Sequence, residues 1–177
     1  MSAPSALAVR VVEALAASGS TVACAESLTG GLLCSALVDV PGASDVVRGA
    51  VVAYATDVKA GVLGVPDDVL AEHGAVHEAT AQAMARGAAR LMGASYAVAT
   101  TGVAGPGPDE GRPAGTVFVA VGAPDDDRDG VAHVRYLRLD GDRSAVRSGA
   151  VVAALSLLLE VLEGTVVRQE EARSVPR

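Results

Sequence analysis

The segment TVACAESLTGGLLCSALV, residues 21–38, decides how this chain folds. Residues 21–25 are small and apolar and have the length of a buried strand, whereas residues 32–38 are an apolar run of helical length. Between these two runs, Gly30 and Gly31 allow the backbone to turn tightly. The segment therefore predicts a strand, a tight turn and a helix, the unit from which α/β proteins are built.

The same alternation of elements continues on both sides of this segment. Residues 102–113 hold four Gly and three Pro and predict a long binding loop, and three aspartates at 125–127 predict a turn. From hydrophobic spacing we expect helices over residues 5–17, 56–63, 66–73, 78–92 and 142–162, and strands over residues 46–54, 95–100, 116–121 and 131–139.

Helices and strands alternate first and a hairpin follows, which predicts the fold class. We expect a single α/β domain over residues 1–168, a three-layer α/β/α sandwich on a mixed, mostly parallel sheet. Residues 169–177 read as a flexible tail. The length of 177 residues suits one domain, and half of the residues are hydrophobic, enough to build a sizeable core.

The charge balance argues against nucleic acid as a partner. The chain has 14 basic and 21 acidic side chains, a formal net charge of -7, whereas phosphate contacts usually require a basic surplus. Trp is absent, and one Phe and three Tyr leave few platforms for base stacking. We therefore expect no nucleic-acid partner.

The apolar runs also argue against a membrane location. They are interrupted by Gly, Pro or charge before the roughly 18 residues that a spanning helix needs. Residues 1–11 have no basic stretch followed by an apolar segment, so we expect no secretory signal and a cytoplasmic protein. Cys24 and Cys34 are then expected to be buried free thiols, and a metal site would need more ligands.

The first candidate for chemistry is Ser27, where the first strand ends and the next helix begins. A Ser at that junction lies close to helix N-terminal amides, which can stabilise an oxyanion. Ser, Thr and Gly are also preferred helix caps, and taken alone the motif is best explained as a cap. It matches neither the G-x-S-x-G elbow nor a P-loop.

The second candidate is the segment from Tyr54 to Lys59. Lys59 is the one Lys of a chain with 13 Arg, and a desolvated Lys can become a neutral base where Arg cannot. A Ser nucleophile needs such a base, and Tyr can relay the proton. Taken singly, Tyr54 as a strand-end residue and Lys59 on a solvated helix face remain the simpler explanations.

The third candidate is the Gly-rich loop, and the fourth is the start of the last helix. Thr101, Gly102 and Gly105 begin the loop, whose backbone amides can approach a phosphate or carboxamide closely. Arg143 follows Gly141 and Asp142 and can hold a phosphate beside a helix N-terminus. The alternatives are a plain crossover loop, and Asp142 as a helix cap with Arg143 solvated. The three His residues suit capping or solvated roles better than catalysis.

A Tyr and Lys pair also suggests a short-chain dehydrogenase. That family places three residues between the two, whereas Tyr54 and Lys59 are separated by four. The glycines near Thr29 also do not form a dinucleotide-binding fingerprint. The sequence therefore disfavours a nicotinamide-dependent oxidoreductase.

Together and in this order, the segments resemble the C-terminal domain of the CinA (competence/damage-inducible) family, whose stand-alone members include PncC, a nicotinamide-nucleotide amidase. The resemblance spans roughly residues 11–159. It rests on residues 25–27, 29–31, 40–44, 49, 52, 54–59, 63–65, 73–76, 101–106, 113–117 and 141–143.

The resemblance implies hydrolysis of the carboxamide of nicotinamide mononucleotide to nicotinate mononucleotide and ammonia, with no metal or organic cofactor. It implies that Ser27 is the nucleophile, assisted by Lys59 directly or through Tyr54. For the oxyanion we expect amides after Ser27, in the substrate-binding segment of Thr29, Gly30 and Gly31. For phosphate and ribose we expect Arg143 and the loop residues Thr101, Gly102 and Gly105.

Two departures from the family pattern keep a second function open. The family commonly has Ser-Asn-Glu-Ala between the Tyr and the Lys, whereas this chain has Ala55-Thr56-Asp57-Val58. This chain also has Arg112 where the family usually has Lys. The alternative is a weakly active or inactive member that binds nucleotide as a regulatory or interaction module. We also expect a homo-oligomer, because a Val- and Ala-rich fold of this size often closes its sheet edges against a copy.

Overall fold

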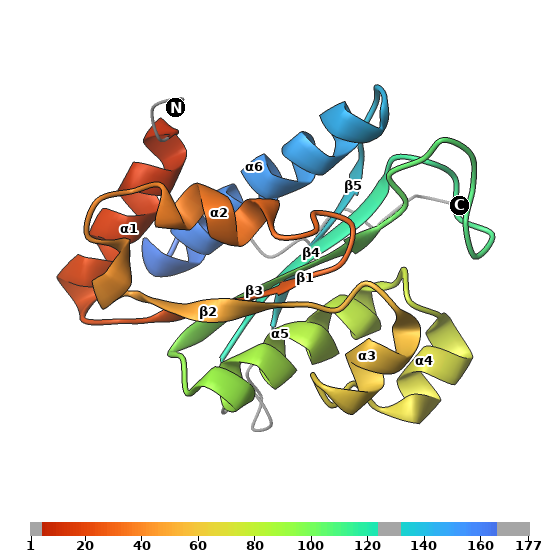
Figure 1. Ribbon diagram of the computed structural model, residues 1–177, viewed down its shortest axis with the longest axis horizontal. Coiled ribbons are helices and arrows are strands. Elements are labelled where there is room, and N and C mark those ends of the chain that lie inside the picture. The colour runs from red at the N-terminus through yellow and green to blue at the C-terminus, as the bar shows by residue number, and fades with distance from the viewer. Residues whose placement is uncertain (1–4, 124–131, 166–177) are drawn as a thin grey trace, which may run out of the picture.

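A five-stranded sheet forms the centre of the molecule (Figure 1). The computed structural model describes residues 5–123 and 132–165. The strands lie in the order β2-β1-β3-β4-β5. Their bounds are Val22–Glu26 for β1, Val47–Val52 for β2, Tyr96–Gly102 for β3, Thr116–Gly122 for β4 and His133–Arg138 for β5.

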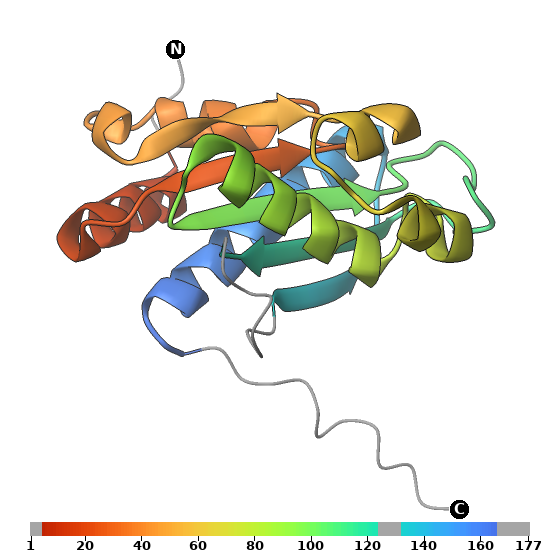
Figure 2. The same cartoon turned by 90° about the horizontal axis from the view of Figure 1, so that it is seen from below.

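The sheet is mixed, as the sequence predicts. Strand β1 pairs in parallel with both β2 and β3, while β4 is antiparallel to β3 and to β5. Four strands therefore run in one direction and β4 alone runs against them (Figure 2). The chain leaves β1 toward β2 and later crosses to β3 on the other side of β1, so the strand order reverses at β1. Ligands of open α/β sheets bind at the carboxyl ends of the strands beside such a point.

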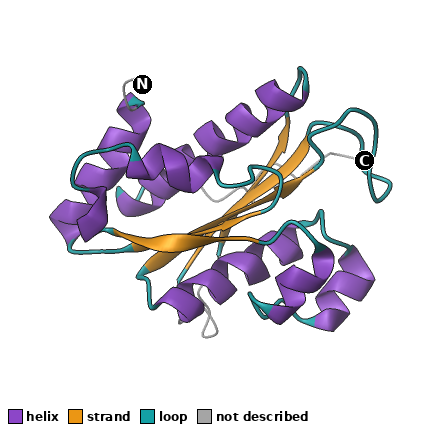
Figure 3. Cartoon of the chain, in the orientation of Figure 1, coloured by secondary structure: helices purple, strands orange, loops and turns teal. Residues whose placement is uncertain are grey.

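Six helices cover the two faces of the sheet and complete the three layers (Figure 3). Helices α1, α2 and α6 lie on one face, and α3, α4 and α5 lie on the other. Their bounds are Ala6–Ser18 for α1, Leu32–Val38 for α2, Thr56–Gly61 for α3, Asp67–His73 for α4, Glu78–Met92 for α5 and Arg143–Leu162 for α6, with a 3-10 turn at Ala43–Asp45. The predicted elements are confirmed to within a few residues.

The two faces of the sheet carry side chains of different size. Because side chains alternate along a strand, Val98 of β3 points to the α1 and α6 side while Ala97 and Ala99 point to α5. Strand β4 repeats the pattern with valines on the first side. The alanine face lets α5 approach the sheet closely. On α5, Gly87 also packs against the segment after α3, where an added Cβ would lie 1.8 Å from the backbone oxygen of Leu63.

Helix ends follow the expected capping chemistry. The Ser5 hydroxyl accepts from the Ala8 amide at the start of α1, and the Asp142 carboxylate accepts from the Ala145 amide at the start of α6. His77 caps α5 by accepting the Ala79 amide at Nδ1, which confirms a capping role for one histidine.

Among the described residues, α6 is the one helix long and apolar enough to cross a bilayer by length and composition. Half of its most apolar window is buried, and its apolar residues form a core cluster with α1 and the sheet. Helix α6 is accordingly a core helix of this fold. The predicted acidic turn at 125–127 and the predicted tail at 169–177 lie outside the described residues.

Candidate active site

Ser27 and Lys59 meet at the carboxyl ends of β1 and β2. Lys59 Nζ lies 3.1 Å from Ser27 Oγ and is also hydrogen-bonded to the carbonyl oxygens of Ala53 at 2.8 Å and Tyr54 at 3.3 Å. The two residues come together because β1 and β2 are parallel neighbours and α3 starts directly after β2. The Ser27 amide is fixed as well, since it donates to the Thr100 carbonyl of β3.

The surroundings of Lys59 favour its neutral form. Its side chain is 1% exposed, and desolvation lowers the pKa of its ammonium group below the ordinary value of 10.5, while the Glu110 carboxylate opposes this by raising the pKa. A neutral amine has two N–H donors and one lone pair. The two carbonyls can only accept, so the lone pair is left for the Ser27 hydroxyl, which can donate. This arrangement is that of a nucleophile and its general base.

Ser27 opens into a cavity of about 340 Å³. The walls come from the ends of β1, β2 and β3, the turn after α4, the Gly-rich loop and the start of α6. Its lining residues are Ser27, Leu28, Tyr54, Thr56, Lys59, Ala75, Val76, Thr101 to Glu110 and Arg143. The predicted residues Thr101, Gly102, Gly105 and Arg143 are therefore brought together with Ser27, Lys59 and Tyr54. Gly102 also packs tightly, because an added Cβ would lie 2.5 Å from the Thr116 oxygen.

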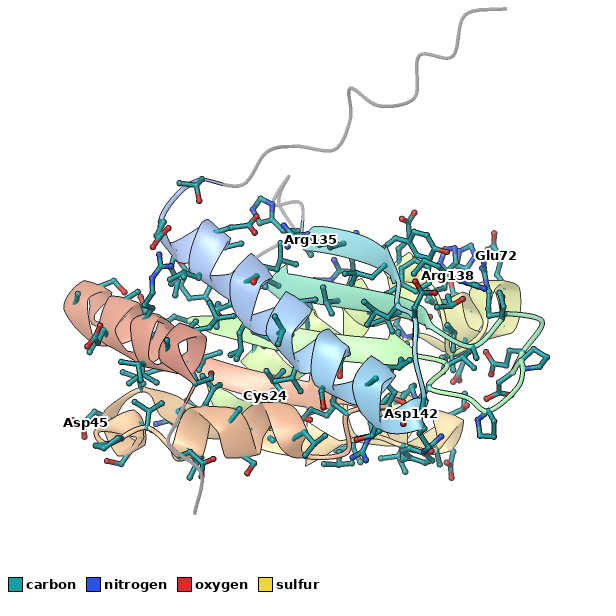
Figure 4. All side chains as sticks on the ribbon, turned by 90° about the horizontal axis from the view of Figure 1, so that it is seen from above. Cys24, Asp45, Glu72, Arg135, Arg138 and Asp142 are labelled. Atoms are coloured by element: carbon teal, nitrogen blue, oxygen red, sulfur yellow. The ribbon has the colours of Figure 1, made fainter. Side chains whose placement is uncertain are left out.

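Tyr54 and Arg143 form the rim of this cavity. The Tyr54 side chain is 61% exposed, and its hydroxyl accepts from Arg143 Nη2 at 2.9 Å. Arg143 Nη1 donates to the Gly105 oxygen at 2.8 Å, so one guanidinium joins the loop to Tyr54. Figure 4 shows Asp142, the preceding residue, at the start of α6. Lys59 contacts the carbonyl of Tyr54 and reaches Ser27 directly, so the direct proton path has the geometry it needs.

The structure places Thr29, Gly30 and Gly31 outside the lining of the cavity. The Gly30 amide donates to the backbone carbonyl oxygen of Ser27, and the Gly31 amide donates to Glu26 Oε2. Thr29 is fully buried, with its hydroxyl 2.8 Å from that of Thr100. The amides of Gly30 and Gly31 are thus engaged inside the fold, which corrects the expectation that they face a ligand.

Glu26 is the residue that takes up these amides, and the sequence interpretation missed it. Its carboxylate is fully buried and accepts from the amides of Gly31, Leu33 and Cys34 at 2.9 to 3.0 Å. An acid beside a helix N-terminus is a capping signal that was available in the sequence. Glu26 therefore anchors α2 immediately behind the nucleophile.

Two further residues near the site were not singled out from the sequence. Glu110, in the loop, has a positive φ of 46° and accepts the Ala75 amide at 2.7 Å. Gly74 makes room for it, since an added Cβ would lie 2.7 Å from the Glu110 carboxylate. Arg147 of α6 donates to the carbonyls of Leu28 and Thr29, just after Ser27. These contacts join segments far apart in the chain, so no local sequence pattern predicts them.

The cysteines and histidines do not line the cavity. Cys24 is buried in β1, Cys34 is half-buried on α2 and both thiols are free, so the free-thiol prediction is confirmed. Hydrogen bonding to Cys24 lowers the pKa of the Cys34 thiol to about 7. The rings of His73 and His77 stack with centroids 4.3 Å apart. Within residues 5–123 and 132–165, no group of three or more His, Cys, Asp or Glu is placed to hold a metal ion.

Comparison with known proteins gives one consistent family. A CinA-like protein of Frankia casuarinae is 50% identical over 145 residues, covering 82% of this chain and 32% of the relative. A CinA-like protein of Anaeromyxobacter sp. (strain K) is 49% identical over 149 residues, covering 84% of this chain and 35% of the relative. The chain thus spans about a third of the length of these curated relatives.

Solved structures agree with the relatives. A CinA superfamily protein from Klebsiella pneumoniae superposes with a TM-score of 0.83 at 38% identity, covering 89% of this chain and 96% of that one. The competence/damage inducible protein CihA from Agrobacterium tumefaciens gives 0.81 at 38% identity, covering 89% and 93%. The family model for the CinA C-terminal domain matches residues 4–162. On these grounds the chain belongs to the CinA C-terminal domain family.

Proposed function

We propose that this protein hydrolyses the carboxamide of nicotinamide mononucleotide, giving nicotinate mononucleotide and ammonia. The observation that carries the proposal is the 3.1 Å contact between Ser27 Oγ and the buried amine of Lys59. Acyl transfer needs a hydroxyl nucleophile with a base in direct contact, and this pair supplies both.

The reaction follows from the contacts of Lys59. As Ser27 Oγ attacks the amide carbon, Lys59 takes the hydroxyl proton and becomes an ammonium held by the carbonyls of Ala53 and Tyr54. The C–N bond then breaks, and Lys59 returns the proton to the leaving nitrogen, which departs as ammonia. Water attacks the Ser27 ester with Lys59 again as base, and the acid leaves.

The rest of the cavity supports a nucleotide as the substrate. Its volume of about 340 Å³ lies in the range of small-ligand pockets. Arg143 is the cation of the rim and, in this proposal, exchanges its bonds to Tyr54 and Gly105 for the substrate phosphate. Thr101, Gly102 and Gly105 then line the ribose and phosphate path, and Tyr54 borders the ring.

Ammonia release from nicotinamide mononucleotide tests the proposal. We expect Ser27→Ala and Lys59→Ala to lose about 10⁴-fold or more in kcat, as nucleophile and base removals do elsewhere. Lys59→Arg should be as inactive, because Arg keeps the charge but cannot release its proton. Ser44→Ala, an exposed serine remote from the cavity, is the matched control and should keep full activity.

The second function makes the opposite forecast. A nucleotide-binding module would bind nicotinamide mononucleotide in calorimetry without releasing ammonia, and Ser27→Ala would then leave the affinity unchanged. Such a result would reject the amidase and direct attention to Thr56, which lines the cavity where the family commonly has Asn.

A further inference from the structure

Helix α6 presents two arginines, four residues apart, to the active site. Arg143 reaches the rim, whereas Arg147 is half-buried and reaches the turn that follows the nucleophile. Arg147 Nε donates to the Leu28 oxygen at 2.9 Å, and Nη2 donates to the Thr29 oxygen at 2.8 Å. Among the described residues, Arg147 forms no ion pair with a carboxylate, so its hydrogen-bonding partners are these two backbone carbonyls.

These bonds fix the orientation of consecutive peptide planes. In a trans peptide the C=O and the next N–H point in opposite directions. Holding the Thr29 carbonyl toward Arg147 therefore turns the Gly30 N–H the other way. There it donates to the backbone carbonyl oxygen of Ser27 at 3.1 Å. With the Ser27 carbonyl fixed in that bond, the N–H of Leu28 is directed away from the turn.

The Leu28 amide is the backbone donor next in sequence to the nucleophile. Leu28 follows Ser27 directly and lines the cavity. Within the described part of the chain neither the Leu28 N–H nor the Thr29 N–H has an acceptor, whereas the Gly30 and Gly31 N–H groups do. Of the two unpaired donors, the Leu28 N–H belongs to a residue that lines the cavity and the Thr29 N–H does not. Backbone N–H groups beside a nucleophile stabilise the negative oxygen of a tetrahedral intermediate.

We propose that Arg147 is a positioning residue, which holds the Leu28 N–H as the oxyanion donor for attack by Ser27. This inference rests on the proposed function only in taking Ser27 as a nucleophile. A guanidinium suits the task because its planar fork holds the Nε and Nη2 donors in a fixed geometry, whereas an ammonium is a compact charge on a flexible stem. Gly30, at a φ of 60°, leaves space for it, since an added Cβ would lie 3.3 Å from Arg147 Nη2.

Steady-state kinetics of Arg147→Ala and Arg147→Lys test the assignment. We expect kcat to fall by about 10- to 100-fold in Arg147→Ala, less than the full loss of an oxyanion donor, with KM changed by less than about threefold. Arg147→Lys should fall in between. Added guanidinium should restore part of kcat in Arg147→Ala. Arg10→Ala, which removes an exposed arginine paired with Glu163, is the control and should behave as wild type.

A second readout does not depend on the substrate. A fluorophosphonate reacts when Ser27 Oγ bonds to phosphorus, fluoride leaves and Lys59 takes the proton, with the phosphoryl oxygen in the oxyanion site. Mass spectrometry of labelled Ser27 should show Arg147→Ala reacting more slowly than wild type by a factor similar to that in kcat.

The two readouts separate the two proposals. Wild-type protein that labels at Ser27 but releases no ammonia would overturn the amidase while leaving the labelling rates to decide on Arg147. Equal labelling rates in wild type and Arg147→Ala would overturn the role of Arg147, provided that thermal unfolding curves show both proteins to be folded. A raised KM with an unchanged kcat in Arg147→Ala would overturn it as well.

Discussion

Lys59 combines deep burial with three hydrogen-bonding partners, and this sets its protonation. Burial favours the neutral amine, whereas the carbonyls of Ala53 and Tyr54 also satisfy an ammonium. The residue can therefore pass between both forms during a reaction without leaving a donor unpaired. Glu110 adds a carboxylate that favours the charged form.

The pH profile should report this balance. The proposed mechanism requires neutral Lys59, so kcat/KM should rise with pH along an acid limb whose midpoint lies below 10.5, because desolvation lowers the pKa of Lys59. Glu110→Gln removes the group that raises this pKa, so the midpoint should move to lower pH. Asp109→Asn is the neighbouring control and should leave it in place. A midpoint that does not respond to Glu110→Gln would contradict the electrostatic role of Glu110.

Arg143 gives a second prediction at the residue scale. Arg143→Ala should raise KM by about tenfold or more, the value of a hydrogen bond to a charged group, and should lower kcat less. The measurement is the KM-against-kcat split for nicotinamide mononucleotide, with Ser144→Ala, an exposed neighbour on α6, as the control. An unchanged KM would remove Arg143 from the phosphate site.

At the scale of elements, α5 shows how composition sets packing distance. Its buried face is mostly alanine and meets the alanine side of the sheet. Small side chains allow a close approach, and Gly87 passes the backbone of Leu63 with no room for a methyl group. The same helix carries His77 at its N-terminus, where burial and His73 lower the pKa of the imidazole.

Gly87→Ala should be costly despite the higher helix propensity of Ala. The added Cβ would meet the Leu63 oxygen at 1.8 Å, so backbone must shift, at about 1–3 kcal/mol for overpacking. Thermal unfolding should show Tm lowered by roughly 2–12 °C for a chain of this length. Gly61→Ala is the matched control, because a Cβ there meets nothing within 4 Å. Equal Tm values in the two variants would contradict the close packing of α5.

Sequence patterns predicted elements better than contacts, and particular elements show why. Helix α5 has the predicted bounds because its capping residues are adjacent in the chain. Strand β3 extends two residues beyond the prediction because Thr101 and Gly102 pair with β4, a contact that local spacing does not reveal. Ser27 and Lys59 were identified, whereas Arg147 was not, because its partners lie 118 and 119 residues away.

At the scale of the whole molecule, the open sheet leaves two edge strands, β2 and β5. Each carries an exposed large apolar side chain, Val52 at 47% and Tyr136 at 53%. Edges with apolar residues are prone to pair with another chain unless charge or covering structure blocks them. The site itself lies at the end of the sheet, where α6 and the loop meet.

We propose that copies of this chain associate through one of these edges. Sedimentation velocity should then give a mass above the 17.6 kDa of one chain. Val52→Lys on β2 or Tyr136→Lys on β5 should return the mass to one chain, because a lysine at an edge opposes pairing. A wild-type mass of 17.6 kDa over a range of concentrations would contradict the association.

The single rod of α6 has a mechanical consequence. Arg143 and Arg147 are one helical turn apart, about 6 Å along the axis, so they move as one rigid piece. A ligand that displaces Arg143 together with α6 would therefore also displace the turn after Ser27, because Arg147 is hydrogen-bonded to that turn. In the proposed enzyme, phosphate binding by Arg143 and the position of the Leu28 N–H are therefore coupled, because a shift of α6 along its axis would change both.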